Sequence, residues 1–139
     1  MRMTRIALSV CAVALCAFAA CSHGTATSSG RTVRTVEISD LVKPGVMYAS
    51  PGDEVRWMNA RENPVRVGFL NRNLLEDHQC QNGIVNLLGE VNDLITIAPG
   101  ESISLCPVRA GDLRYNVWFD ADNPRGSMSP TMTVRIRGG

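Results

Sequence analysis

A chain of 139 residues is long enough for one domain, and its formal net charge of +1 leaves little excess of either sign. Its basic residues are not clustered, which argues against a nucleic-acid-binding protein. The sequence has two histidines and neither a Gly-x-Ser-x-Gly nor a His-Glu-x-x-His motif. A Ser-His-Asp triad would have to use His78, because His23 falls in a small polar stretch. We therefore expect no enzymatic activity.

Residues 1–20 have the pattern of a secretory signal, a short basic start followed by an apolar run too short to span a membrane. Ala19 and Ala20 precede Cys21, an arrangement that resembles a bacterial lipobox. The resemblance implies that Cys21 is lipidated, becomes the new N-terminus and attaches the chain to a membrane. A plain signal peptide cut near the same place is the alternative.

Cleavage would remove Arg2 and Arg5, so the mature chain would carry 12 basic and 13 acidic residues and a net charge of −1. With Cys21 lipidated, Cys80 and Cys106 are the two cysteines left in an exported chain, which indicates one disulfide. Two independent buried thiols are the alternative. The small, polar residues 21–30 are typical of a flexible tether. We place the folded domain at residues 31–139.

Short segments of alternating apolar and polar residues follow the tether, and turn signals such as Pro51-Gly52 and Pro99-Gly100 separate them. The expected strands are 32–38, 46–48, 54–59, 65–69, 94–97, 102–106, 113–119 and 131–136. Residues 71–93 are irregular but apolar enough to pack against the rest, as a loop with a short helix. The pattern predicts an all-β, antiparallel sandwich of about seven or eight strands with an insert near 71–93.

The order of these pieces resembles the cupredoxin family over residues 33–136. The matching pieces are the Pro51-Gly52-Asp53 turn before the strand 55–59, the Pro99-Gly100-Glu101 turn before 102–106, and a closing strand after Met128. The resemblance implies a Greek-key β-sandwich, and in that family a copper ion at one end of it.

The copper ligands of the family are missing here. The first histidine would follow Pro64, where the chain has Val65, and the cysteine would fall at Val117. The second histidine would lie within 121–127, which contains none, so Met128 alone matches. A blue-copper centre needs two imidazoles and a thiolate, with methionine as a weak axial ligand. We expect no metal cofactor, with a non-standard copper site built on His78 and Met128 as the alternative.

Protein binding is the remaining function that the sequence favours. Trp118 is out of phase with Tyr115 and Val117, so it is expected to face outward near Arg72 and Arg125. An exposed aromatic side chain beside arginines is typical of an interaction hot spot. The alternative is that the 71–93 insert covers Trp118.

We therefore expect a lipid-anchored envelope protein whose cupredoxin-like domain is a non-catalytic binding or structural module. Its partners would be the membrane, through the lipid, and an envelope protein. Ser22 after the cysteine slightly favours the outer membrane in a cell that has one. A copper-binding or electron-transfer protein, and an accessory subunit of an envelope respiratory or transport complex, are the alternatives.

Overall fold

The structure is a computed structural model, and it describes residues 30–76, 78–86 and 90–138. The predicted signal peptide, the lipidation site Cys21 and residues 21–29 of the predicted tether lie outside the described residues. These assignments stay predictions. No helix in the described part of the chain is long and apolar enough to cross a membrane.

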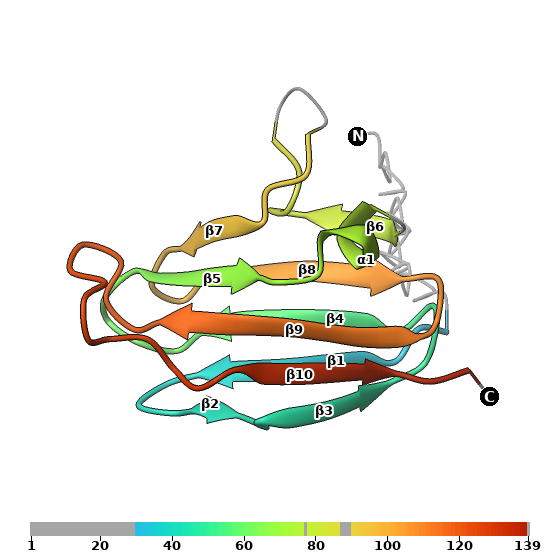
Figure 1. The fold of residues 1–139 in the computed structure, drawn as a ribbon, viewed down its shortest axis with the longest axis horizontal. Helices are drawn as coiled ribbons and strands as arrows, with labels where there is room; N and C mark the ends of the chain where they lie inside the picture. Colours follow the sequence, from blue (N-terminus) through green and yellow to red (C-terminus); the bar gives the residue numbers. More distant parts are fainter. Residues whose placement is uncertain (1–29, 77, 87–89, 139) are drawn as a thin grey trace, which may run out of the picture.

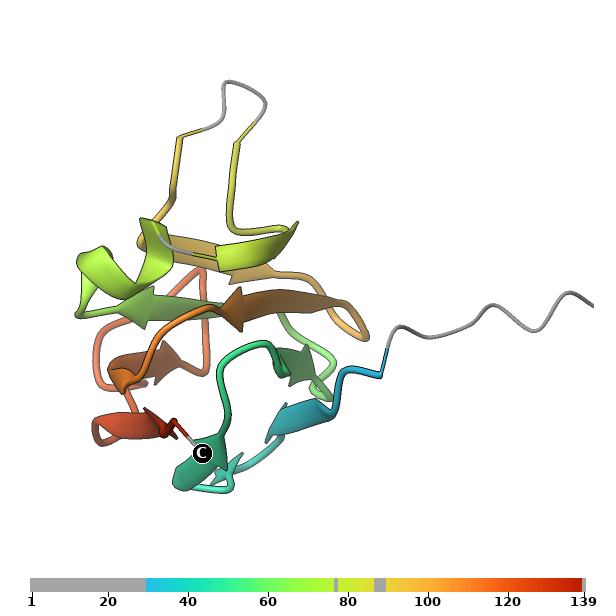
Figure 2. The ribbon, with the colours of Figure 1, turned by 90° about the vertical axis from the view of Figure 1, so that its right-hand side faces the viewer.

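Two sheets of five strands each form the described domain, and Figures 1 and 2 show them as two facing layers. The first sheet has the order β2-β1-β4-β8-β6. Its strands are β1 Val33–Ile38, β2 Val42–Lys43, β4 Glu54–Asn59, β6 His78–Asn82 and β8 Ser102–Pro107. β1 runs parallel to β4, whereas the other pairs in this sheet are antiparallel.

The second sheet has the order β3-β10-β9-β5-β7. Its strands are β3 Val46–Ala49, β5 Val65–Phe69, β7 Leu94–Ile97, β9 Gly111–Trp118 and β10 Met132–Ile136. In this sheet β3 and β10 pair in parallel, and the other described pairs are antiparallel. The predicted all-β, Greek-key sandwich with a short-helix insert is confirmed, with ten strands in the described residues rather than seven or eight. The two that the pattern did not predict are the two-residue β2 and the strand β6.

Alternate side chains of the strands point between the sheets, as the period of two requires. Three aromatic rings form the centre of this core: Trp57 packs edge-on against Phe69 at 5.0 Å and against Tyr115 at 5.5 Å between ring centroids. Tyr115 is fully buried, and this burial raises its pKa to about 12. Tyr115 is therefore uncharged at neutral pH. The edge-on arrangement of Trp57 against the other two rings is one that aromatic pairs prefer.

The insert is more ordered than its sequence suggested. It begins with the helix α1, Arg72–Glu76, whose buried Leu74 and Leu75 pack against the core. β6 then pairs with β8 and becomes one edge of the first sheet. The described residues 84–86 and 90–92 form a two-stranded arm, held by the bridge between Val85 and Val91, that extends beyond the sandwich (Figures 1 and 2).

Candidate functional site: the loop end and the outer face around Trp118

Aliphatic side chains occupy two of the positions at which the cupredoxin resemblance would place copper ligands. Val65 and Val117 are both fully buried in the second sheet, on neighbouring strands β5 and β9. Met128 is 57% exposed and pairs by its backbone with Trp118. A largely exposed thioether beside two buried valines offers a metal ion no set of inward-facing donors.

The 120–127 loop is folded onto itself by its own hydrogen bonds. Asp120 Oδ1 accepts bonds from the N–H groups of Asp122 and Asn123, at 3.0 and 2.9 Å. The N–H of Phe119 donates to the carbonyl of Ser127 at 3.0 Å, which closes the loop. The polar groups at this end are thus used to hold the loop in shape.

An arginine stacks at the same end of the sandwich. Arg61 lies over the ring of Phe119 with its guanidinium carbon 5.4 Å from the centroid, and its Nη1 donates to the carbonyl of Ser39 at 2.8 Å. It also forms an ion pair with the fully exposed Asp40, at 3.3 Å. Ser39, Asp40 and Arg61 line a polar hollow of about 350 Å³. A fixed guanidinium here adds positive charge, which opposes the binding of a metal cation.

The non-standard copper pair is not brought together. The backbone of His78 begins β6 opposite Pro107, and Met128 lies at the opposite end of the sandwich (Figure 1). The side chain of His78 lies outside the described structure. Cys80 and Cys106 form the predicted disulfide, so neither sulfur is a thiolate. Among the described residues, no three His, Cys, Asp or Glu side chains are grouped closely enough to hold a metal ion.

Of the three residues predicted for partner binding, Arg72 is separated from the other two. Arg72 begins α1 and pairs with Glu76 and Asp93, both at 3.9 Å. Arg125 is exposed in the 120–127 loop, at the end of the sandwich opposite to α1 (Figure 1). Trp118 ends β9 at the same end as Arg125.

Trp118 is half-buried because its ring lies across the backbone of a neighbouring strand. A Cβ atom at Gly68 would come within 2.6 Å of ring carbon Cζ3 of Trp118 and 3.4 Å of Cδ1 of Leu94. Glycine at this position therefore makes room for the indole on the outer face of β5. The ring faces outward, as its phase predicted, but it rests on Gly68 beside Leu94.

Three rows of outward residues cross β9, β5 and β7 around this ring. Arg66 lies opposite Trp118 on one side and Thr96 on the other. Gly68 lies opposite Asn116 and Leu94, and the N–H of Leu70 donates to the carbonyl of Arg114 at 2.8 Å. We call this surface the tryptophan–arginine face, and it consists of Arg66, Gly68, Leu70, Leu94, Thr96, Arg114 and Trp118.

The tryptophan–arginine face combines unpaired positive charge with exposed apolar surface. Neither Arg66 nor Arg114 has a side-chain ion pair or hydrogen bond with any described residue. Leu70 and Leu94 are 52% and 51% exposed. Exposed leucines beside arginines and a positioned tryptophan have the composition of a protein-binding surface.

Sequence reasoning found Trp118 but missed the arginines next to it. The signal was present in the alternation of β5, where Val65, Val67 and Phe69 are buried and Arg66 must point outward. The alternation within β5 does not predict that β5 pairs with β9. That pairing places Arg66 opposite Trp118.

Among the comparisons with known proteins, the comparison with solved structures is the one that finds similar chains. No protein-family model matches the chain, and no curated protein matches it. The chain is similar to a methionine-to-alanine variant of amicyanin in its Cu(I) form, with 18% identity, 81% of this chain and 87% of that chain covered, and a TM-score of 0.48. An oxidized proline-to-alanine variant and a reduced tryptophan-to-tyrosine variant of amicyanin match with the same values.

Proposed function

We propose that this chain, a cupredoxin-like β-sandwich with valine at two copper-ligand positions, is a non-catalytic binding module of the bacterial cell envelope. The tryptophan–arginine face is its docking surface, and its partner is an envelope protein with an acidic surface around an apolar centre. An accessory subunit of an envelope respiratory or transport complex is one form that such a module takes.

The observation that carries this proposal is the pair Arg66 and Arg114, whose charges no described carboxylate neutralises. Opposite charge on a partner steers association and fixes the orientation of docking. Acidic side chains on the partner would supply the missing counter-charges.

Trp118 supports the same proposal through its fixed position. Because the ring already rests on Gly68, little side-chain freedom remains to be lost when a partner covers it. Leu70 and Leu94 supply apolar surface around it, and burying such surface drives association. Positioned tryptophans within apolar surroundings are frequent hot spots.

The direction of the N-terminal segment suits attachment through a lipid on Cys21. Residues 30–32 lead into β1, which belongs to the first sheet, whereas the tryptophan–arginine face is the outer surface of the second (Figure 2). A tether that joins on the first sheet's side leaves the second sheet's outer face open. Attachment by more than one acyl chain, as the lipobox resemblance implies, would hold the module stably on a membrane.

The experiment compares native complexes formed by the full-length chain in mild-detergent extracts of membranes. We expect the wild type to migrate in a complex larger than the monomer, and Arg66→Glu with Arg114→Glu to release the monomer. Lys43→Glu is the matched control, because Lys43 is exposed on the first sheet. Cys21→Ala should move the chain out of the membrane fraction. A complex that survives the double reversal would refute the docking surface, and membrane retention of Cys21→Ala would refute the anchor.

A further inference from the structure

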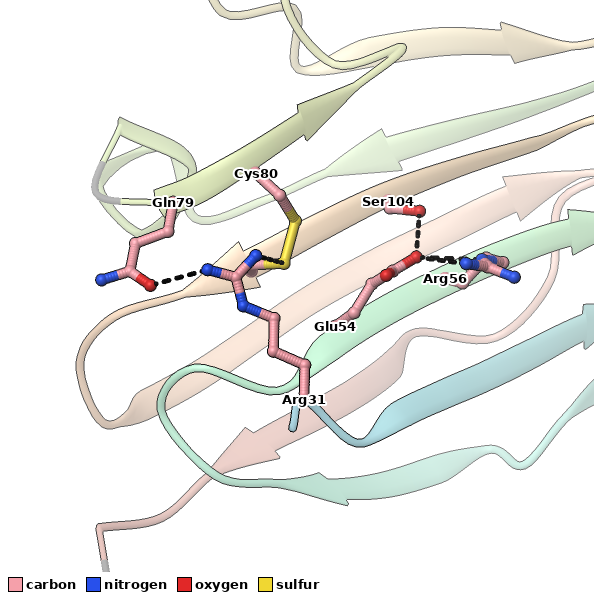
Figure 3. Close-up of a disulfide and its surroundings, with 7 residues drawn as sticks. Arg31, Glu54, Arg56, Gln79, Cys80 and Ser104 are labelled. Carbon is pink, nitrogen blue, oxygen red and sulfur yellow. Dashed lines mark hydrogen bonds and ion pairs between the residues drawn. A yellow bond between two sulfur atoms is a disulfide. The ribbon is translucent and has the colours of Figure 1, made fainter. Parts of the chain in front are cut away.

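The disulfide lies where the N-terminal segment meets the first sheet. Cys80 on β6 and Cys106 on β8 are cross-strand neighbours, with their Cα atoms 5.1 Å apart. Figure 3 shows Arg31, which precedes β1, reaching across to the disulfide, where it contacts Sγ of Cys106. A site for sulfur chemistry at this point would be independent of the tryptophan–arginine face.

The two cysteines differ in their access to solvent. Cys106 has none of its surface exposed, whereas Cys80 is only partly buried. A thiolate from solution must approach one sulfur of a disulfide in line with the S–S bond and displace the other. The difference in exposure directs that attack to Cys80 and makes Cys106 the leaving sulfur.

Arg31 places its positive charge against the sulfur that would leave. Its Nη1 lies 3.8 Å from Sγ of Cys106, and its Nη2 donates to Oε1 of Gln79 at 3.0 Å. Both of these partners are uncharged, and no described carboxylate forms an ion pair with Arg31. The guanidinium charge therefore remains available to a developing thiolate, which nearby arginines stabilise.

Glu54 is the acidic group in this neighbourhood that could compete for Arg31. Its Oε1 accepts hydrogen bonds from Nη2 of Arg56 at 2.6 Å and from Oγ of Ser104 at 2.8 Å (Figure 3). Arg56 thus carries the counter-charge of Glu54. Arg31 acts on Glu54 through its charge without forming an ion pair or a hydrogen bond with it, so its N–H groups remain on Cys106 and Gln79.

We propose that Cys80–Cys106 is a thiol-exchange site, with Cys80 as the point of attack and Arg31 as the group that stabilises the Cys106 thiolate. The incoming thiolate forms a bond to Sγ of Cys80 as the Cys80–Cys106 bond breaks, and the electron pair of that bond goes to Sγ of Cys106. A second thiol then attacks the mixed disulfide, which leaves two reduced cysteines and one oxidised disulfide made from the two attacking thiols. The two electrons come from these thiols, so the partner is a dithiol protein or a small thiol such as glutathione.

β6 has a second attachment to β8 besides the disulfide. β6 also pairs with β8 through its backbone on both sides of a bulge, at His78 and at Gln81 and Asn82. These hydrogen bonds hold the edge strand when the covalent link opens.

The first test measures the rate at which glutathione or dithiothreitol reduces the disulfide of the native full-length protein at low ionic strength. We expect Arg31→Gln to slow reduction by roughly three- to tenfold, because positive charge beside the leaving sulfur stabilises the thiolate and so raises the rate. Arg31→Lys keeps that charge and should restore most of the rate. Arg135→Gln is the matched control, since this exposed arginine lies on β10 of the other sheet and outside the tryptophan–arginine face. Equal rates for the wild type and Arg31→Gln would overturn the proposal.

The second test identifies the sulfur that is attacked, and it does not depend on the Arg31 variants. The reaction with glutathione is stopped with acid at early times, and the mixed disulfide is located by mass spectrometry of peptides. We expect glutathione on Cys80. An adduct on Cys106 would overturn the proposal, because the fully buried cysteine would then be the point of attack and Cys80 the leaving group.

Discussion

The two outer faces of the sandwich are organised in opposite ways. On the first sheet, Glu54 is held by Arg56 and Ser104, and the neighbouring strands β6 and β8 are linked by a disulfide. On the second sheet, Arg66 and Arg114 point outward without an acidic partner among the described residues, beside exposed leucines. The first face pairs its polar groups around Glu54, whereas the second face leaves the charges and the apolar surface around Trp118 exposed.

This difference separates residues that stabilise the chain from residues that serve a partner. A polar group that is hydrogen-bonded inside the protein costs stability when it is removed. An exposed charge without a partner costs almost none, because water already solvates it. Substitutions of the hydrogen-bonded and disulfide-linked residues on the first sheet's outer face should therefore lower stability, whereas Arg66 and Arg114 substitutions on the second should change binding alone.

The largest expected effect is removal of the disulfide. The two cysteines are 26 residues apart, so Cys80→Ala with Cys106→Ala should lower the free energy of unfolding by about 3 to 4 kcal/mol in the chain-entropy model. Urea denaturation measures this change. Amide exchange should quicken most in β6, the edge strand that the bond secures, and less in β7, the matching edge of the second sheet. A loss below about 1 kcal/mol would show that the covalent link is not a main support of the first sheet.

The next effect is the loss of the Glu54 carboxylate, which should depend on pH. Burial of Glu54 by itself would raise its pKa, but the hydrogen bonds from Arg56 and Ser104, with the charges of Arg56 and Arg31, outweigh burial and lower the pKa below its ordinary value. We expect Glu54→Gln to lower the free energy of unfolding by about 1 kcal/mol at pH 7, as for a charge-assisted hydrogen bond.

The sign of the pH dependence follows from the lowered pKa. A carboxyl group with a lower pKa in the folded chain stabilises the fold fully above its unfolded pKa, near 4.3, and this stabilisation is lost as the pH falls through the folded value. The difference between the wild type and Glu54→Gln should therefore shrink below about pH 4.3. Glu37→Gln is the control, because Glu37 is exposed on β1 of the same sheet. A difference that stays constant down to pH 2 would contradict the assignment.

The sequence predicted the strands of the core well because each one alternates with a period of two. β4 is an example, since Val55, Trp57 and Asn59 are buried and the residues between them are not. β6 was missed because its sequence, His-Gln-Cys-Gln-Asn, has no apolar alternation to mark a strand. It is a strand because it pairs with β8 and because Cys80 is bonded to Cys106. Only tertiary contacts supply that information.

The candidate site, like β6, could be predicted from the sequence only in part. The outward direction of Trp118 follows from its phase on β9, and the prediction of the disulfide followed from counting cysteines. The neighbours of Trp118 could not be predicted in this way, because they depend on the register that sets Arg66 opposite Trp118. Arg72 was expected near Trp118, but β5 runs the length of the sandwich before α1 begins, which carries Arg72 to the other end (Figure 1).

The smallest effect on stability, and the sharpest test of the second face, is expected from Gly68→Ala. The added Cβ would meet the ring of Trp118 at 2.6 Å, and a side chain at the surface can swing away. We expect a loss of less than about 1 kcal/mol in the free energy of unfolding, as for other surface changes without a buried polar group.

The ring should move into solvent, which shifts tryptophan emission to the red and increases acrylamide quenching. The variant Trp118→Phe shows which part of the tryptophan emission comes from Trp118, because the other tryptophan, Trp57, is fully buried. If binding needs the ring held on Gly68, Gly68→Ala should weaken partner binding while the fold stays intact, and unchanged quenching would show that the indole is not held there.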